Sequence, residues 1–371
     1  MVVITPTFTA GFDSSFGANA AAAKAAWQAA ADVFANRLVD NIHVNITVDA
    51  VAGTGVFGQS NMSLFSISYA DLLARVTARA TTQDDQVAIG PGGSMTAADP
   101  TNGAGTWWVT RSQGKALGTV PDDTASDGTT RFGAGNPFTF SGPIAAGTYD
   151  FRGIAAHEIT EVMGRLGISG GTIGSTSNSY SLIDNYSYTG PRTKGLRGGP
   201  GNFFSIDGGT TLLKLWNDPT TNGLDSRDWA PGTDDAFNQF SNPGVVNGVT
   251  PVDLRLMDVL GYTLTAPVQP GAGVTRFIVT QNGQPSGVTR GHGTFTFDVS
   301  GIGVNRTKGV LATVSEVAQG PTGQFDRPFR GSATMRVLNV SPQDNGNVLL
   351  WVQVNWNSDL NLRLQLVRVD D

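Results

Sequence analysis

Apolar residues in the first part of the chain follow two spacings, one typical of strands and one typical of helices. Residues 2–9 and 41–51 are predicted strands, and in the second (N-I-H-V-N-I-T-V-D-A-V) apolar and polar residues alternate. Residues 19–39 and 68–79 place apolar residues on one helical face, and Ser68 is a suitable N-cap for the second helix. We therefore expect two amphipathic helices packed on a sheet.

The next segment predicts a β-hairpin and a third helix. Residues 107–110 (W-W-V-T) open a strand, and residues 115–118 follow after a polar turn, which favours a hairpin. Residues 154–167 read I-A-A-H-E-I-T-E-V-M-G-R-L-G, a strongly apolar helix that Gly164 and Gly167 should end. The order of elements indicates an α+β layer arrangement in which this helix lies beneath a twisted sheet.

The last hundred or so residues show a different pattern of apolar and polar residues. Residues 254–262 predict a closing helix, and the proline- and glycine-rich stretch 266–273 (A-P-V-Q-P-G-A-G) predicts a linker between a first domain, 1–265, and a second, 274–371. The second domain is expected to be an all-β sandwich, because apolar and polar residues alternate in several of its runs. These runs are 277–279, 293–299, 309–314, 332–340, 347–356 and 360–369.

Composition limits the possible partners and location of the protein. The formal net charge of −6 and the absence of a basic cluster argue against nucleic acid and anionic membranes as partners. The chain has no cysteine, which excludes disulfides and thiolate zinc sites, and no run of 18 apolar residues that could span a membrane. Its 48 glycines and 15% charged residues are typical of extracellular bacterial β-rich proteins. We expect a secreted protein whose signal peptide precedes the sequence given.

The third predicted helix contains the candidate metal-binding and catalytic residues. His157-Glu158-Ile159-Thr160-Glu161 differs by one residue type from the zinc-protease motif H-E-x-x-H. Positions i and i+4 share a helical face, so His157 and Glu161 could bind one metal ion while Glu158 reaches a water molecule. A carboxylate can replace an imidazole, although a second anionic ligand lowers the Lewis acidity of the metal. The alternative is an ordinary charged helix face, but polar residues within so apolar a helix need partners.

A catalytic zinc site requires a third protein ligand. The chain has three histidines. Besides His157 they are His43, expected on the solvent-exposed face of a strand, and His292, expected in a turn. An oxygen donor is therefore expected, and Asp184 is our first choice because it follows two apolar residues soon after the helix. The other candidates are Tyr180, Tyr186, Asp207, Asp225 and Asp228.

Several motifs in order along the chain resemble a known family. They are H-E-I-T-E-V-M-G-R, N-F-F-S-I-D-G-G-T-T-L-L-K-L-W-N, D-S-R-D-W-A, D-A-F-N and D-L-R-L-M-D-V-L-G-Y. Together they resemble a group of secreted bacterial zincin-like metalloproteases, over residues 1 to about 265. The resemblance implies a zincin-like catalytic domain and a zinc-dependent endopeptidase, with His157 and Glu161 as ligands and Glu158 as general base. Gly167 stands where metzincins have a third histidine.

The resemblance also suggests roles for residues around the metal. Glu158 would take a proton from metal-activated water and pass it to the leaving amine of a protein or peptide substrate. Tyr186 or Arg192 would stabilise the oxyanion. By analogy, the strand at 107–110 would line the cleft and bind peptide by strand addition. Arg165 is expected to anchor the fold through a carboxylate pair.

A second hypothesis of a different kind stays open. Leu182 stands where the family has an aspartate, so the chain could be an inactive zincin scaffold that acts as a secreted binding module. Trp351 and Trp356 in the second domain could stack on glycans, or they could be core residues of alternating strands. Calcium ions bound in the loops are a further open alternative. Bound zinc and a third ligand would distinguish the enzyme from the scaffold.

Overall fold

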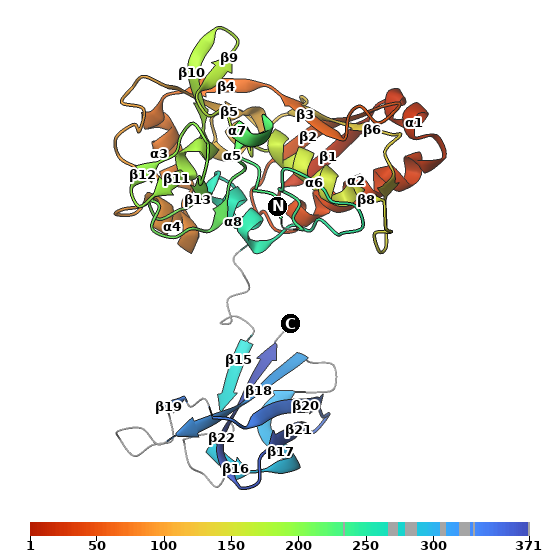
Figure 1. The fold of residues 1–371 in the computed structure, drawn as a ribbon, viewed down its shortest axis with the longest axis vertical. Coiled ribbons are helices and arrows are strands. Elements are labelled where there is room, and N and C mark those ends of the chain that lie inside the picture. Colours follow the sequence, from red (N-terminus) through yellow and green to blue (C-terminus); the bar gives the residue numbers. More distant parts are fainter. Residues whose placement is uncertain are drawn as a thin grey trace. The chain divides into compact units, whose positions relative to one another are not determined.

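Figure 1 shows the computed structural model, which describes residues 1–232, 234–265, 274–278, 288–304, 309–318, 327–328 and 331–369. The chain divides into two compact units, Met1–Thr265 (the first unit) and Ala266–Asp371 (the second unit). The first unit is mixed α+β, and the second consists of antiparallel sheets like those of a β-sandwich. These features confirm the general fold class. The predicted linker, 266–273, lies outside the described residues.

The first unit is built around a four-stranded sheet in the order β1-β2-β6-β3. β1 (Val3–Phe8), β2 (His43–Val51) and β6 (Gly128–Gly133) are parallel, and β3 (Gly58–Met62) is an antiparallel strand at the edge. Every second residue of β2 is buried, as its alternating sequence predicts. The predicted alanine-rich helix is α2 (Ala20–Ala35), whose small buried side chains let it pack closely.

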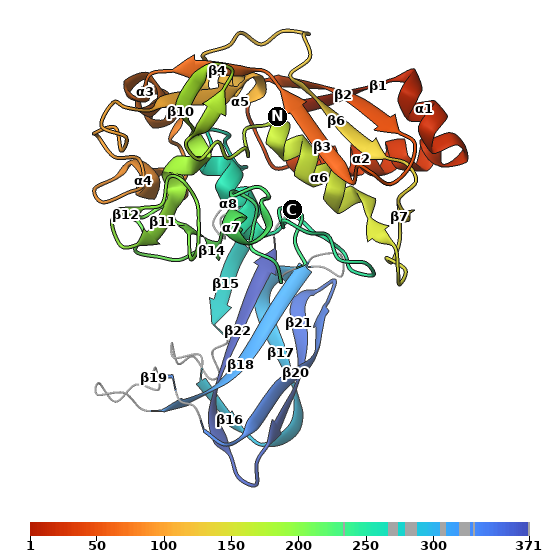
Figure 2. The ribbon, with the colours of Figure 1, turned by 45° about the horizontal axis from the view of Figure 1, so that its top comes forward.

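Helix α6 (Phe151–Val162) carries the H-E-x-x-E motif and packs against β3, β6 and α2 (Figure 2). The Asp150 side chain caps its start by accepting from the backbone N–H of Arg152. Its end is set by Gly164, whose φ of 105° is unfavourable for other residues. Glu158 and Glu161 are buried along with the apolar residues of this helix, so α6 brings carboxylates into the interior.

A second sheet has the order β4-β5-β10-β9, from Leu64–Ile67, Thr106–Thr110, Thr176–Ser181 and Gly171–Ile173. The predicted hairpin at 107–118 is wrong, because residues 111–117 form helix α5 (Arg111–Leu117). The Thr110 hydroxyl accepts from the N–H of Gln113 and starts this helix, and Gly118 ends it in the left-handed conformation. A cap of this kind is a local signal for a helix. The predicted helix at 68–79 is α3 (Tyr69–Arg79), with Ser68 as its N-cap.

A third sheet, a two-stranded sheet and several short helices complete the first unit. The predicted closing helix is α8 (Pro251–Val259), and its Met257 is a buried core residue. The third sheet has the order β12-β11-β13-β14 (Thr193–Lys194, Ser187–Gly190, Phe203–Phe204, Lys214–Leu215). The other elements are α1 (Ala10–Phe16), η1 (Gly17–Asn19), α4 (Gln83–Ile89), η2 (Leu182–Tyr186), α7 (Pro219–Asn222), and the paired strands β7 (Phe138–Thr139) and β8 (Tyr149–Asp150).

The described residues of the second unit form two antiparallel sheets. One joins β15 (Val274–Ile278), β22 (Leu360–Val369), β18 (Gly309–Ala318) and β19 (Arg327–Pro328), with β16 (Val288–Gly291) also on β22. The other has the order β17-β21-β20 (Gly293–Val304, Gly346–Asn355, Thr334–Pro342). Alternate residues of β21 and β22 form the core, which leaves Trp351 half exposed, as is Trp356 just beyond β21. Neither tryptophan is therefore a core residue.

Candidate metal centre

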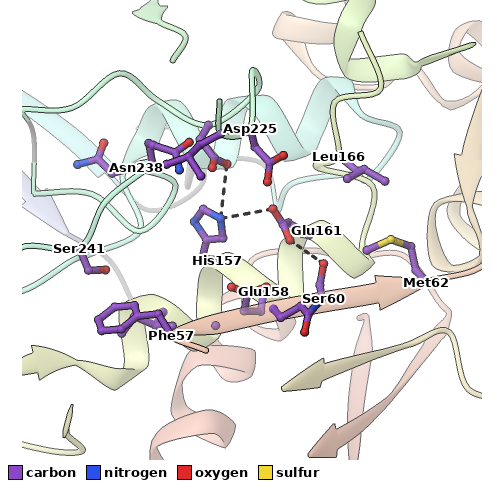
Figure 3. A pocket seen from close by; sticks show the side chains of 16 residues that line it. Phe57, Ser60, Met62, His157, Glu158, Glu161, Leu166, Asp225, Asn238 and Ser241 are labelled. Carbon is purple, nitrogen blue, oxygen red and sulfur yellow. Dashed lines mark hydrogen bonds and ion pairs between the residues drawn. The ribbon is translucent and has the colours of Figure 1, made fainter. Parts of the chain in front are cut away.

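One face of α6 borders a cavity of about 510 Å³. His157, Glu158 and Glu161 reach it from the helix, and Ser60 reaches it from β3 (Figure 3). The opposite wall is a loop that contributes the side chains Leu224, Asp225, Asp228, Asn238, Gln239 and Ser241. The cavity thus joins parts of the chain that lie far apart in sequence.

His157 is held so that one ring nitrogen faces the acidic side chains of the cavity. Its Nδ1 lies 2.9 Å from the carbonyl oxygen of Ala236, and a proton on Nδ1 that is donated there leaves the Nε2 lone pair free. Nε2 lies 3.4 Å from Oε1 of Glu161 and 3.4 Å from Oδ1 of Asp228. Figure 3 marks both interactions with dashed lines.

These two separations fit a single small metal ion. Zinc bonds to nitrogen and oxygen are roughly 2.0–2.2 Å, and tetrahedral angles then place neighbouring donors about 3.3–3.6 Å apart. Two groups of side chains have donor atoms within 4.8 Å of one another: His157 with Glu158 and Glu161, and Glu161 with Asp225 and Asp228. Both groups belong to this cavity and share Glu161. The described residues therefore include acidic and histidine side chains close enough to hold a metal ion, as expected.

The electrostatics of His157 also favour a cation at this position. Burial and the Arg165 guanidinium would lower its pKa, but the carboxylates of Asp228 and Glu161 outweigh them and raise the pKa of His157 to about 9. The negative potential that stabilises an imidazolium would equally stabilise a metal ion bound to neutral imidazole. The same surroundings therefore suit either a proton or a metal on Nε2.

The carboxylates outnumber the cations that touch them. Burial raises the pKa of Glu158 well above its usual range, and the charge of Glu161 adds to this. Partial removal from water, followed by the charges of Glu161 and Asp228, raises the pKa of Asp225 to about 6, although the residue is exposed. For Glu161 the effect of burial is overcome by the hydrogen bond and charge of His157, which help to lower its pKa to about 2. A divalent cation would stabilise the ionised forms of all these groups.

Glu158 lies against the edge strand with one oxygen unsatisfied. Its Oε2 is buried and has no hydrogen-bond partner among the described residues. A Cβ on Gly58 of β3 would come within 2.4 Å of Glu158 Oε1 and 2.9 Å of Ile154 Cγ2, so only glycine fits there without displacement. A buried polar atom without a partner beside a cavity is unusual and needs a functional explanation.

Ser60 orients the central carboxylate. Its hydroxyl donates to Glu161 Oε2 over 2.6 Å, while the other oxygen of Glu161 faces His157. Neither Ser60 nor Gly58 has a local sequence signal that predicts its role. The β3 sequence, G-Q-S-N-M, has no apolar periodicity that would predict a strand, and only its position beside α6 gives it a role.

The structure does not bring Asp184, our first choice of third ligand, to the cavity. Asp184 is fully buried within η2 and forms an ion pair with Arg227 over 2.8 Å. Its two oxygens also accept from backbone and hydroxyl groups of Ile168, Ser169 and Ser181. These donors saturate the carboxylate, so the prediction of Asp184 as a ligand is wrong. The aspartate beside His157 is Asp228, and Asp225 lies close to Glu161 and Asp228.

Tyr186 is also misplaced as a catalytic residue. It is fully buried, and its hydroxyl donates to the carbonyl of Val259 over 2.8 Å, away from the cavity lining. Tyr180, Asp207 and Arg192 do not line the cavity either. The strand at 107–110 is an interior strand, paired on both sides, and the strand beside the cavity is β3.

The remaining predictions concern single residues. Arg165 forms the expected carboxylate pair, with Asp228 over 2.6 Å. His43 and His292 lie on exposed surface, each beside an aspartate. Among the described residues, no helix is long and apolar enough to cross a membrane.

No protein-family model, curated protein or solved structure matches this chain. The resemblance to zincin-like metalloproteases therefore stays a prediction from the sequence motifs. What the structure itself provides is a cluster of the half-buried His157, three buried carboxylates and the exposed Asp225 that could hold a metal ion.

Proposed function

We propose that the first unit is a zinc-dependent endopeptidase in which His157, Glu161 and Asp228 hold one zinc ion. The observation that carries this proposal is the pair of 3.4 Å separations from His157 Nε2 to the two carboxylates. Each matches the spacing of two donors on one tetrahedral zinc ion, which needs three protein ligands and one open position. Asp225, on the opposite wall of the same cavity, is a further candidate oxygen ligand.

The chain supplies the proton transfers that hydrolysis of a peptide bond requires. A bound zinc ion would act as a Lewis acid and would acidify a water molecule at the open position. Glu158 borders the same cavity and has an oxygen without a partner, so it can accept a proton and later donate it to the leaving amine. The side chains of Asn238 and Gln239 line the cavity and replace Tyr186 as candidate donors to an oxyanion.

The position of β3 at the edge of its sheet favours a peptide as the substrate. Among the strands that the structure describes, β3 pairs with β6 alone, and its residues line the cavity beside the candidate ligands. An extended peptide could form main-chain hydrogen bonds with the free side of such a strand. The cavity lining includes the apolar side chains of Phe57 and Ile154 as well as those of Met62, Leu166 and Leu224. These surfaces suit apolar side chains on the substrate.

The first test is the zinc content of the purified protein together with cleavage of a denatured protein substrate, before and after chelation. We expect one zinc ion per chain and chelator-sensitive cleavage, with both lost in His157→Ala. His43→Ala is the matched control, because His43 is exposed and pairs with Asp122 at the surface. A folded wild-type protein without zinc or activity would favour the inactive scaffold instead. Detection of the chain in culture medium would test the proposed secretion.

A second candidate function concerns the second unit. Trp351 is 50% exposed on β21, opposite Thr296 of β17 and Asn339 of β20, both exposed. A flat aromatic side chain between neutral hydrogen-bonding groups is suited to stacking on a sugar ring. We propose glycan binding here, to be tested by retention of the protein on insoluble polysaccharides. Retention should be lost in Trp351→Ala and kept in Leu311→Ala, which removes an exposed apolar side chain from the other sheet.

A further inference from the structure

Arg165 lies directly behind the candidate metal ligands. The chain reverses at Gly164, and the backbone N–H of Arg165 donates to the carbonyl of Thr160 over 2.9 Å. The Arg165 side chain therefore turns back along the last turn of α6, where it is completely buried. A buried guanidinium must have its hydrogen-bonding groups satisfied by the protein.

Each nitrogen of this guanidinium has a partner. Nε donates to the hydroxyl of Thr160 over 3.0 Å, and one terminal nitrogen donates to Asp228 Oδ1 over 2.6 Å. The other terminal nitrogen donates to the carbonyl of His157 over 3.2 Å and lies 3.6 Å from Glu161 Oε1. The two carboxylate oxygens that Arg165 contacts are the same two that lie 3.4 Å from His157 Nε2.

Arg165 also supports the imidazole. Its guanidinium carbon lies 4.5 Å from the centre of the Phe237 ring, a cation–π arrangement. The neighbouring residue, Ala236, provides the carbonyl that faces His157 Nδ1. Arg165 thus contacts the carboxylates of Asp228 and Glu161 directly. It reaches His157 through the main-chain carbonyl of His157 and through Phe237, the neighbour of Ala236.

We infer that Arg165 is a positioning residue for metal binding, which sets the spacing of the three donor atoms and adds one positive charge behind the two carboxylate ligands. This inference rests on the proposed function. Two anionic ligands would otherwise repel each other and weaken the Lewis acidity of the ion. A lysine would retain the charge, but its compact ammonium cannot reproduce the planar fork or the stacking on Phe237.

The test is zinc affinity, measured by competition with a chromophoric chelator in the full-length protein. We expect Arg165→Lys to bind zinc about 10–100-fold more weakly than wild type, the usual effect of losing a partner of a metal ligand. Absorption bands of the cobalt-substituted protein should shift as well, because they report the geometry of the ligands. Lys115→Met is the control, since it removes an equally buried cation, paired with Asp127 over 2.8 Å, that does not line the cavity.

A zinc affinity of Arg165→Lys within threefold of wild type, with an unchanged cobalt spectrum, would overturn the inference. An equal loss of affinity in Lys115→Met would do the same, because general loosening of the fold would then explain it. If Arg165→Lys does not fold, Phe237→Leu replaces it: we expect affinity to fall about tenfold, and unchanged affinity overturns the inference. A wild-type protein that binds no zinc would refute the proposed function itself.

Discussion

Two buried aspartate–arginine pairs in the first unit look alike but differ in what surrounds them. Asp184 pairs with Arg227 over 2.8 Å, and Asp228 pairs with Arg165 over 2.6 Å. Around Asp184, backbone N–H groups and serine hydroxyls supply the remaining hydrogen bonds. A buried carboxylate with so many donors stabilises the fold and has no capacity left for a ligand.

The cavity around Asp228 differs from the surroundings of Asp184, because several carboxylates share few hydrogen-bond donors there. Glu158, Glu161 and Asp225 line the same cavity, and Glu158 Oε2 has no partner in the described chain. The difference shows how a structural carboxylate can be told from a candidate ligand: the number of donors matters more than burial or the presence of an arginine. The predictions below test this distinction.

The largest expected effect is on catalysis. Glu158→Gln should lower kcat/KM by about 10²–10⁴-fold, or about 3–5 kcal/mol, because the amide cannot accept the proton. The free energy of unfolding should not fall, since the substitution replaces a buried carboxyl group whose Oε2 has no hydrogen-bond partner in the part of the chain that the structure describes. Peptidase assays and denaturant unfolding check this. Near-wild-type kcat/KM would remove Glu158 from the proposed mechanism.

The opposite result is expected at Asp184. Asp184→Asn leaves the buried Arg227 without its counter-charge and should reduce the free energy of unfolding by about 3 kcal/mol. Zinc bound per folded molecule should stay the same, because Asp184 does not line the cavity. Denaturant unfolding and metal analysis measure the two quantities. Loss of zinc from the folded variant would restore Asp184 as a ligand.

A smaller effect is expected from Gly58→Ala. The added methyl would come within 2.4 Å of Glu158 Oε1, so Glu158 must move. We expect about a tenfold fall in kcat/KM, or about 1.4 kcal/mol, with little change in zinc content. Gly55→Ala is the control, because an added Cβ there meets no atom within 4 Å. Equal activity of the two variants would show that β3 does not constrain Glu158.

The smallest effect concerns pH and a buried carboxyl outside the cavity. Burial raises the pKa of Asp258 to about 7, and the nearby Asp85 adds to the rise. Between about pH 4 and 7 the folded protein therefore holds a proton on Asp258 that the unfolded chain has released, so this group makes stability fall as pH rises.

Asp258→Asn should remove this contribution. From pH 6 to 7, the wild-type free energy of unfolding should decrease by about 1 kcal/mol more than that of Asp258→Asn. Denaturant unfolding at both pH values measures the difference. Parallel pH profiles would show that the Thr82 hydroxyl and the Leu264 N–H already stabilise the ionised carboxylate fully.

The sequence by itself determined those elements whose signals are local. Alternation predicted β2 and the long strands of the second unit, and Ser68 marked the start of α3. The i, i+4 spacing placed His157 and Glu161 on one helical face. The hairpin prediction is wrong at a local signal too, because Thr110 caps a helix where the sequence pattern predicts a turn and a strand.

Only the tertiary structure decided which distant residues complete the site. Ser60 lies 101 positions before Glu161, and Asp228 lies 63 positions after Arg165. In sequence, only its position after two apolar residues soon after the helix favours Asp184 over Asp228 as an oxygen donor. Their different roles depend on how many N–H and O–H groups the folded chain places around each carboxylate, and the spacing of apolar residues carries no information about that number.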